Sequence, residues 1–481
     1  MIEIALIVTP LLLAAIAVAW PSQRTRPWLL PAAGAVHTSL TLTLLLRPPS
    51  EPVGAWLGFD ELARAVLPMV SILFLVCSIY AVAYLRIRAD QSNRLFVTML
   101  LSLHALFSFA LQARHLGLLW IGVEAATLLT VPLLHFNNTA RAIEATWKYL
   151  IVGGTGIALS LLGSFCLGYA SLHGGGSGDL TFAGLTSQGP ALSRPWLVAA
   201  WVLLLAGYGT KMGLAPMHTW KPDAYGEAPG IVGAILAGGA TTVAFVAVLR
   251  VKQVVDAAGA GPMAERTLLA FGLFSMVVAA LFLLGTRDFK RMLAYSSVEH
   301  MGILAVGAAF GAAGLSAALF HVWNNGLTKG ALFLSAGNIR RAARARTVDT
   351  VSGMAWCSPI SARLLIVGLL AVTAIPPFGP FFSELRVVGA GLATGHGGAV
   401  AVFVICVLLA FLGLTRLMFA IVDGRPRGPA REERRASGRE TAGVVVPPLL
   451  FLCLSLWLGL AAPSLLQQSW HAAATFLHPL R

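Results

Sequence analysis

The hydrophobic residues of this chain are gathered into long continuous runs, and short polar segments separate one run from the next. A helix needs roughly 20 apolar residues to cross the hydrocarbon core of a bilayer, and these runs are of that order. Ten-residue segments of alternating polarity, which form membrane β-barrels, do not occur. The pattern predicts an all-α polytopic membrane protein with about fourteen transmembrane helices. They are expected at about 2–20, 28–46, 63–85, 95–112, 114–134, 142–170, 196–220, 229–251, 267–285, 290–310, 313–337, 358–393, 397–422 and 442–462.

Composition narrows the class of protein further. Of the 481 residues, 57% are hydrophobic and 11% are charged, whereas about a quarter of the residues in soluble domains are charged. This excludes a cytosolic, fibrous or disordered protein. The formal net charge of +14 lies mainly in short connections, so we expect a lipid bilayer around the chain and no nucleic-acid partner. The five cysteines show no CxxC spacing, and no phosphate-binding loop occurs, so we expect no cofactor in this chain.

Basic residues alternate between rich and poor connections along the chain. Since lysine and arginine favour the cytoplasmic loops of membrane proteins, we expect the rich connections in the cytoplasm and both termini outside. The rich set is Arg24, Arg26, Arg86, Arg88, Arg94, Arg141, Lys221, Arg287, Lys290, Arg291, Arg340, Arg341, Arg344, Arg346 and the run from Arg425 to Arg439. The poor set is Arg47, Arg64, Arg114, Arg194, Arg250, Lys252, Arg266 and Arg481.

Two of the predicted spans are interrupted by glycine and proline. The seventh contains Gly209–Pro216 and the twelfth contains Ile375–Pro380, and an ionisable residue adjoins each break, Lys211 and Glu384 respectively. Paired interruptions are typical of inverted repeats in transporters, which predicts one repeat in spans 4–8 and a second in spans 9–13. The expected organisation is N-terminal helices at 1–94, a first repeat at 95–252, a second at 267–422, a basic cytoplasmic loop at 423–441, and a C-terminal helix and tail at 442–481.

Several ionisable residues lie within apolar runs, where a charge is costly and a functional role is the default interpretation. Glu124 is in the middle of the fifth span, and the alternative is a structural hydrogen bond between two helices. Lys211 adjoins a helix break, and lysine suits proton transfer because, unlike arginine, it can lose its proton. Lys148 follows Glu144 by one helical turn, so a helix-stabilising pair is as good an interpretation as a relay function.

The tenth and eleventh spans carry a second group of polar residues. Glu299 and His300 lie in the tenth span, and His321, Asn325 and Lys329 share one face of the eleventh. We interpret this stripe as a hydrated proton relay that continues to Glu384 in the twelfth span. No two of these histidines have an HxxxH spacing, so no metal site is expected.

Three stretches of the chain, together with their order, resemble a known family. This family comprises the antiporter-like, proton-translocating membrane subunits shared by respiratory complex I, Mrp antiporters and membrane-bound NiFe hydrogenases. The resemblance covers about 60–420, and Glu144–Leu150 and Ser296–Gly302 are most similar to component F of hydrogenase 4. The three stretches are Trp120–Glu124, Gly209–Pro229 and Asp288–Gly302.

The resemblance implies a role for each buried ionisable residue. In this family a glutamate of the fifth span and a lysine of the seventh form an ion pair whose separation drives proton transfer. A lysine of the sixth span, a histidine and a lysine of the eleventh, and an exit residue of the twelfth complete the relay. The matching residues here are Glu124, Lys211, Lys148, His321, Lys329 and Glu384.

The chain departs from this family pattern at two positions. The lysine of the eighth span that links the two half-channels is replaced by Thr242, and the second histidine of the eleventh span is replaced by Asn325. Threonine and asparagine can hold water but cannot store a proton at neutral pH. Either water bridges the halves at these positions, or conduction is weakened or lost. We treat Thr242 and Asn325, with Glu299 and His218, as secondary relay residues.

The sequence therefore predicts a proton-translocating membrane subunit of a redox-driven complex of the hydrogenase-4 or complex I type, in a prokaryotic inner membrane. Other membrane and peripheral subunits are the expected partners, and they would hold the Ni–Fe, Fe–S or flavin centres. Protons are the expected substrate, with Na⁺ open. Two alternatives are an Mrp-type cation/proton antiporter subunit and a structural paralogue that does not conduct.

Overall fold

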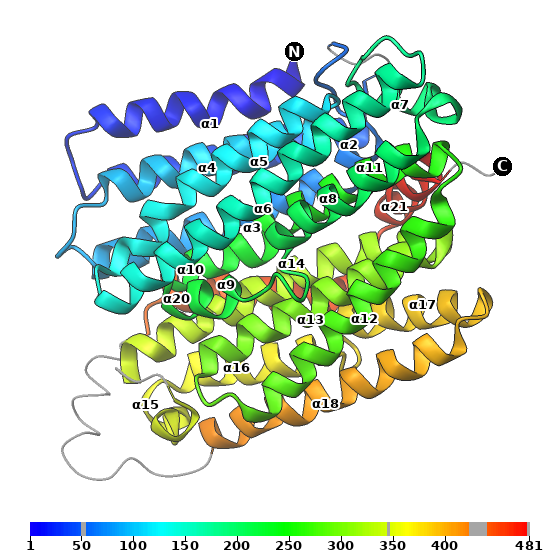
Figure 1. Cartoon of the computed structure of the whole chain (residues 1–481). Coiled ribbons are helices and arrows are strands. Elements are labelled where there is room, and N and C mark those ends of the chain that lie inside the picture. Colours follow the sequence, from blue (N-terminus) through cyan, green and yellow to red (C-terminus); the bar gives the residue numbers. More distant parts are fainter. Residues whose placement is uncertain (50–53, 344–346, 423–439, 479–481) are drawn as a thin grey trace.

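The computed structural model describes residues 1–49, 54–343, 347–422 and 440–478. Most of these residues are helical, and this part of the chain contains three isolated β-bridges but no β-strand. Figure 1 shows long helices running side by side in one bundle. The predicted all-α polytopic fold is confirmed.

A helix or a broken helix occupies each of the fourteen predicted positions. The first three helices are α1 (Ile2–Ala19), α2 (Leu29–Leu46) and α3 (Glu61–Ile87). The first half continues with α4 (Arg94–Gln112), α5 (Leu116–Leu134), α6 (Ala140–His173), α8 (Arg194–Met212) with α9 (Trp220–Glu227), and α10 (Gly230–Ile235) with α11 (Thr241–Ala257). The second half contains α12 (Gly261–Gly285), α13 (Phe289–Ala309), α14 (Gly311–Ala343), α16 (Pro359–Val372) with α17 (Gly379–Ala393), and α18 (Gly397–Val422). The last span is α20 (Ala442–Ala461).

Ten helices in the described ranges are long and apolar enough to cross a membrane. The four predicted spans outside this group are α8 with α9, α13, α14, and α16 with α17. They carry the polar residues and the breaks predicted above. These four spans hold Lys211, the two histidines, Lys329 and Glu384, whereas Glu124, Lys148 and Thr242 lie on helices of the first group. Neighbouring protein must cover the polar groups of both sets.

Both predicted breaks are present. Helix α8 ends at Met212, and Gly213 follows with a φ of 85°, a left-handed conformation that favours glycine. Short helix α9 then begins at Trp220. In the second half α16 ends at Val372, and α17 begins at Gly379 with proline in its first turn. The broken helix therefore comes fourth in each half, followed by one more span.

The eighth span contains a feature that the hydrophobic pattern did not predict. Residues Leu236–Ala240 form a π-helix (η4) between α10 and α11. A Cβ atom added to Gly238 would lie 3.1 Å from the Cα atom of Gly326 on α14, so the two helices approach closely here. Short π-helical segments inside α-helices are frequent at functional sites.

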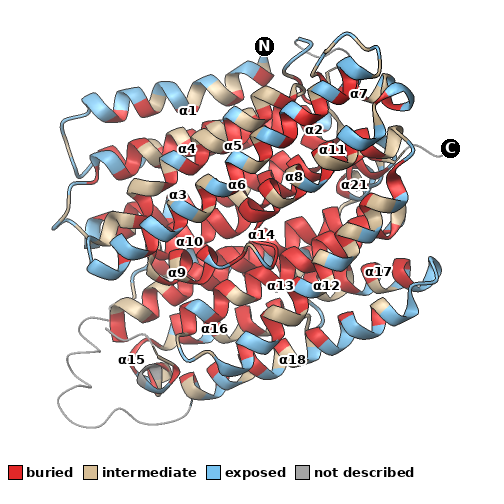
Figure 2. Cartoon of the chain, in the orientation of Figure 1, coloured by how far each residue is buried: buried red, intermediate tan, exposed pale blue. Residues whose placement is uncertain are grey.

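Helix α14 lies in the interior of the bundle. It packs against α3, α10, α13, α16, α17, α20 and the C-terminal helix α21 (Ser464–Leu477). Figure 2 shows α14 almost entirely buried, whereas α1 and α18 expose one side. The exposed sides carry large apolar residues such as Leu12 and Leu408, as expected of helices that face lipid. The polar stripe of the eleventh span is therefore in the protein core.

The chain after residue 462 was expected to be a tail, and this is wrong. Residues Ser464–Leu477 form helix α21, which packs on α3 and α14. Its Trp470 is buried and stacks on Phe320 at a centroid distance of 4.7 Å. Burial of this ring on one side of a short amphipathic helix explains why α21 folds back onto the bundle.

The N-terminus and α21 lie at the same end of the bundle, as does the connection that contains α7 (Phe182–Ser187), whereas α9 lies toward the opposite end (Figure 1). This arrangement agrees with an even number of spans.

Arg250 and Lys252, expected in a connection, instead lie buried in α11 and pair with Asp60 and Asp256, each at 2.7 Å. The predicted basic loop at 423–441 lies outside the described residues except for its last two positions, as do Arg344, Arg346 and Arg481.

Candidate functional site

The predicted pair Glu124–Lys211 is brought together by α5 and α8. The Lys211 Nζ atom lies 3.8 Å from Glu124 Oε2 and donates a hydrogen bond of 2.8 Å to Thr127 Oγ1. Within the described residues, Glu124 Oε2 has no hydrogen-bond partner. The lysine is therefore at ion-pair distance from the carboxylate but hydrogen-bonded to a neutral hydroxyl one turn away.

Helix α6 leaves room for this lysine at a glycine. A Cβ atom at Gly153 would lie 3.1 Å from Lys211 Nζ, whereas one at Gly154 would meet nothing within 4 Å. A cavity of about 30 Å³ adjoins the ammonium, and its lining includes Thr127, Trp220 and Leu236. A cavity of this volume is large enough for a water molecule, and Thr127, Thr130 and Tyr149 supply polar groups in an otherwise mostly apolar lining. Lys211 therefore has space for a water on the side of the π-helix.

Lys148 lies in a charged pocket at the end of α6. Its Nζ atom is 2.7 Å from Glu144 Oε1 and 3.1 Å from Asp223 Oδ2, and 49% of its side chain is exposed. Asp223, on α9, also pairs with Arg291 of α13. The pocket has a volume of about 350 Å³. Lys148 thus makes the helix-stabilising contact with Glu144 and also lines a polar access to the bundle.

A second polar pocket shares Glu227 with this one. It has a volume of about 460 Å³, and four basic residues are among its lining, namely Arg88, Lys290, Arg340 and Arg341. Lys290 donates to the carbonyls of Gly226 and Ala228 at 3.2 and 2.5 Å, and Arg340 pairs with Glu227 at 3.0 Å. Cations at the C-terminal end of a helix are favourable, so these contacts hold α9 in place.

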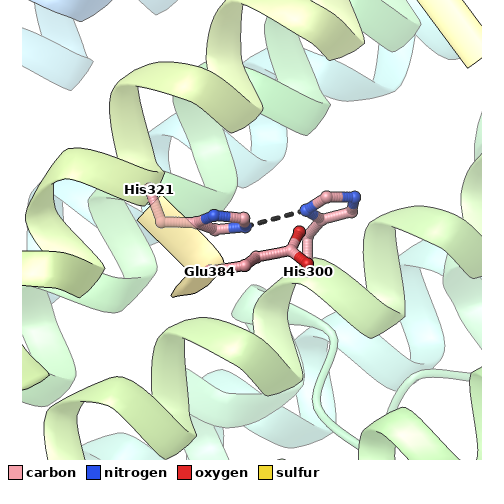
Figure 3. Close-up of side chains that lie close together, drawn as sticks. All are labelled: His300, His321 and Glu384. Atoms are coloured by element: carbon pink, nitrogen blue, oxygen red, sulfur yellow. Dashed lines mark hydrogen bonds between the residues drawn. The ribbon is translucent and has the colours of Figure 1, made fainter. Parts of the chain in front are cut away.

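The second half contains a buried chain of hydrogen bonds across three helices. His300 Nδ1 on α13 lies 2.8 Å from His321 Nε2 on α14, and His321 Nδ1 lies 2.9 Å from Ser383 Oγ on α17. Figure 3 shows the Glu384 side chain beside both rings. All four residues are at most 6% exposed. The predicted residues of the tenth, eleventh and twelfth spans therefore form one cluster.

Lys329 lies about two helical turns beyond His321 on the same helix, α14. Its side chain is fully buried, and Nζ donates a hydrogen bond of 2.6 Å to Ser296 Oγ on α13. Its charge acts on both buried carboxylates, Glu299 and Glu384. Glu384 in addition lines an apolar pocket of about 400 Å³ between α17 and α18. The cluster thus extends from the middle of the bundle to its outer helices.

His300, His321 and Glu384 place ligand atoms within 4.8 Å of one another, which is close enough to hold a metal ion. The two facing ring nitrogens are, however, hydrogen-bonded to each other, and the other nitrogen of His321 is bonded to Ser383. The charge of Lys329 also acts on both histidines. This geometry favours a hydrogen-bonded relay over a metal centre, and the absence of a metal stays a prediction.

The two departures from the family pattern meet at the π-helix. Thr242 Oγ1 donates a hydrogen bond of 2.6 Å to the Gly238 carbonyl, and Asn325 Nδ2 donates one of 3.2 Å to the Ala237 carbonyl. Both side chains therefore satisfy backbone groups of η4. His218, the remaining secondary residue, lies in the break of the seventh span near the Tyr295 ring, 8% exposed.

Two residues of α9 were missed by the sequence analysis. Lys221 was expected in a cytoplasmic connection, but its side chain is fully buried, so that assignment is wrong. Asp223, which bridges α6 and α13, was not singled out at all. The available signal was their position on a short helix directly after a break, flanked by the aromatic residues Trp220 and Tyr225.

This fold and this set of buried charges are those of an antiporter-like polytopic membrane subunit. Residues 113–411 match the family described as NADH:quinone oxidoreductase/Mrp antiporter, transmembrane region. The chain belongs to this family, and the predicted resemblance is confirmed.

Particular relatives bear different names. A hydrogenase-4 component F homolog of Methylacidiphilum infernorum is 33% identical over 418 residues, which cover 85% of this chain and 87% of the relative. NADH-quinone oxidoreductase subunit N of Desulforudis audaxviator is 32% identical, with 80% and 76% covered. This multi-pass chain is thus an antiporter-like membrane subunit with relatives in hydrogenase and quinone-reducing complexes.

Two solved structures share the fold. The Mrp complex of a Dietzia species contains a chain with a TM-score of 0.87 at 23% identity, covering 100% of this chain and 98% of that one. A chain of respiratory complex I from Thermus thermophilus has a TM-score of 0.77 at 24% identity, with 97% and 99% covered. At these identities the likeness concerns the fold alone.

Proposed function

We propose that this chain moves protons across a prokaryotic inner membrane as a subunit of a redox-driven complex of the hydrogenase-4 or complex I type. The observation that carries the proposal is the buried pair Glu124–Lys211 beside a broken helix, with Thr127 as a second partner for the lysine. The names of the relatives support the type of complex. Partner membrane and peripheral subunits would hold Ni–Fe, Fe–S or flavin centres, because this chain lacks Cys motifs for them.

The first step takes place at Lys211. When the ammonium faces Glu124, the carboxylate stabilises its charge. When it turns to Thr127, it keeps a hydrogen bond but loses most of the attraction, and in a low-dielectric site the neutral amine is then favoured. A proton leaves toward the adjacent cavity, and the polar pocket around Lys148 and Asp223 resupplies one from the end of the bundle predicted to be cytoplasmic.

The second step takes place in the cluster of the second half. Lys329 receives the proton and shares it with the chain His300–His321–Ser383. Each histidine can accept on one nitrogen and donate from the other, so the hydrogen bonds provide a path for successive transfers. Glu384 at the outer end of the cluster passes the proton on to the outside.

A specific observation also favours the alternative of an Mrp-type cation/proton antiporter subunit. The match to a chain of the Mrp complex covers the whole of this chain with a TM-score of 0.87. In that case Na⁺ would move in exchange for protons through partner subunits. The two functions differ in whether proton movement requires Na⁺.

The test uses the native complex, purified by a tag on this chain and reconstituted into vesicles that contain a pH-sensitive dye. A potassium diffusion potential drives proton flux, so the electron donor need not be known, and mass spectrometry identifies the partner subunits. We expect Lys211→Met to lower flux by at least about tenfold. Lys252→Met is the matched control, because Lys252 is buried but pairs with Asp256 in α11 outside the site.

Four outcomes are informative. Flux that is lost in Lys211→Met, retained in Lys252→Met and independent of Na⁺ supports the proposal. Flux that appears only with Na⁺ assigns the Mrp-type function. Equal flux with and without Lys211 contradicts a relay through this pair, and a complex without flux in its native form would be the non-conducting paralogue that Thr242 and Asn325 suggest.

A further inference from the structure

Lys221 occupies a place between the two halves of the protein. It lies on α9, which packs against α6 of the first half and α13 of the second. Its side chain is fully buried, although α9 itself begins only one residue earlier, after the break. The stem runs against Gly213, where a Cβ atom would come within 2.8 Å of Lys221 Nζ. The fold thus directs this lysine into the protein interior.

The contacts of the Lys221 ammonium join the two lysines of the relay. Nζ donates a hydrogen bond of 2.8 Å to the carbonyl of Met212, the residue directly after Lys211. It donates a second bond of 3.4 Å to the carbonyl of Ser297, the residue directly after the Ser296 that bonds Lys329. Lys221 therefore contacts the backbone directly beside Lys211 in the first half and directly beside the hydrogen-bond partner of Lys329 in the second half.

The surroundings of Lys221 are those of a residue that can change its charge. No carboxylate lies within 4.0 Å of its Nζ atom in the part of the chain that the structure describes, and its other neighbour is the face of the Tyr225 ring at 5.6 Å. A buried ammonium without a counter-ion is held in its charged form only by such weaker contacts. A lysine with a purely structural task would more commonly have an acidic partner.

Unpaired polar atoms surround the same position. The hydroxyls of Ser297 and Tyr225 and the Nδ1 atom of His218 are buried and have no hydrogen-bond partner among the described residues. Buried polar groups are rarely left unpaired, and a bound water is the usual explanation. The charge of Lys221 also acts on His218, His300 and Lys329. A change in the charge of Lys221 therefore affects residues in both halves of the protein.

We propose that Lys221 is the proton-carrying residue that links Lys211 of the first half to Lys329 of the second. This inference rests on the proposed proton translocation. When Lys211 releases its proton, Lys221 takes it up through water in the break of the seventh span. The new charge repels the proton of Lys329, which moves on into the histidine chain, and the neutral Lys329 then receives the proton of Lys221. Transfer between the halves then needs no titratable group at Thr242, whose hydroxyl is bonded to the backbone of the π-helix.

The experiment measures potential-driven proton flux in vesicles with the native complex carrying single substitutions. We expect Lys221→Met to reduce flux by at least about tenfold, as Lys211→Met does. Lys221→Arg keeps a positive charge and hydrogen-bond donors, so it preserves a structural role, yet it should also fail because a guanidinium does not release its proton. The control Lys252→Met should conduct like the native complex, and Thr242→Val, which removes the hydroxyl at the π-helix, is measured in parallel as the competing route.

The results separate this inference from the proposed function. If Lys211→Met abolishes flux but both Lys221 variants conduct normally, the relay stands and Lys221 is not part of it. Normal flux in Lys221→Arg alone assigns a structural charge to this position and overturns the inference. If Thr242→Val loses flux and the Lys221 variants do not, the link runs through the π-helix. Should Lys221→Met fail to assemble, the arginine variant decides the question alone.

Discussion

Replacing Glu124 by glutamine removes one charge and keeps the shape of the side chain. At the Nζ–Oε2 distance of 3.8 Å, the attraction lost is about 1 kcal/mol in a water-like dielectric and about 4 kcal/mol at an effective dielectric constant of about 20. The exposed fractions are 23% for Glu124 and 7% for Lys211, so the larger value is the better guide. Since about 1.4 kcal/mol is a factor of ten, Lys211 should hold its proton roughly sixfold to a thousandfold less tightly.

The assay is again potential-driven proton flux in vesicles with the native complex. Glu265→Gln is the matched control, because Glu265 lies at the same distance of 3.8 Å from Lys252 and is similarly exposed, but outside the site. We expect flux to fall by at least about sixfold in Glu124→Gln and to stay at the native level in Glu265→Gln. A Glu124→Gln complex that conducts within twofold of the native rate would refute the view that this pair controls the proton on Lys211.

Two further predictions concern single contacts of the site, and a third concerns the topology. Gly153→Ala places a methyl group 3.1 Å from the Lys211 ammonium and should lower flux about three- to tenfold. Gly154→Ala is the control, because open space surrounds that position, and it should not lower flux. Equal flux in both variants would show that this ammonium tolerates displacement. Ser383→Ala removes the hydroxyl that holds His321 and should cost about 1 kcal/mol in thermal unfolding and slow proton flux, with both unchanged if the histidine chain does not matter. A cysteine placed at exposed Ser177 should react with an impermeant thiol reagent added outside, and one at exposed Asp90 should react only from the cytoplasmic side. If both cysteines are labelled from the same side, the topology is refuted.

The helical fold could be predicted because an apolar run of bilayer length leaves a clear signature in the sequence. The π-helix at Leu236–Ala240 left none, because a local change of backbone hydrogen bonding does not alter the hydrophobic pattern. Helix α21 was missed because it is shorter than a span and is stabilised by burying Trp470 on α14. Such packing depends on residues far away in the chain.

The residues of the candidate site likewise include some that the sequence predicted and some that it did not. Glu124, Lys211 and Lys329 could be predicted because each is an ionisable residue within an apolar run. The free-energy cost of a charge in the membrane makes a functional role the default interpretation there. Lys221 and Asp223 did not stand out, because they follow a Gly–Pro break and are adjacent to other polar residues, as residues in a solvated connection are. Whether such a lysine is solvated or buried depends on how α9 folds back between α6 and α13, and the local sequence does not specify this.

The two lysines at the break each rest against a glycine, Lys211 against Gly153 of another helix and Lys221 against Gly213 of its own segment. In evolutionary terms, we expect each ammonium and the space left by its glycine to be selected together. A lineage that loses the lysine releases the glycine from selection for space, and a lineage that gains a side chain at the glycine loses the proton carrier without mutating it. Among relatives, the identity of position 153 should therefore vary together with position 211. At position 213 the left-handed backbone would keep glycine favoured even where no lysine follows at 221.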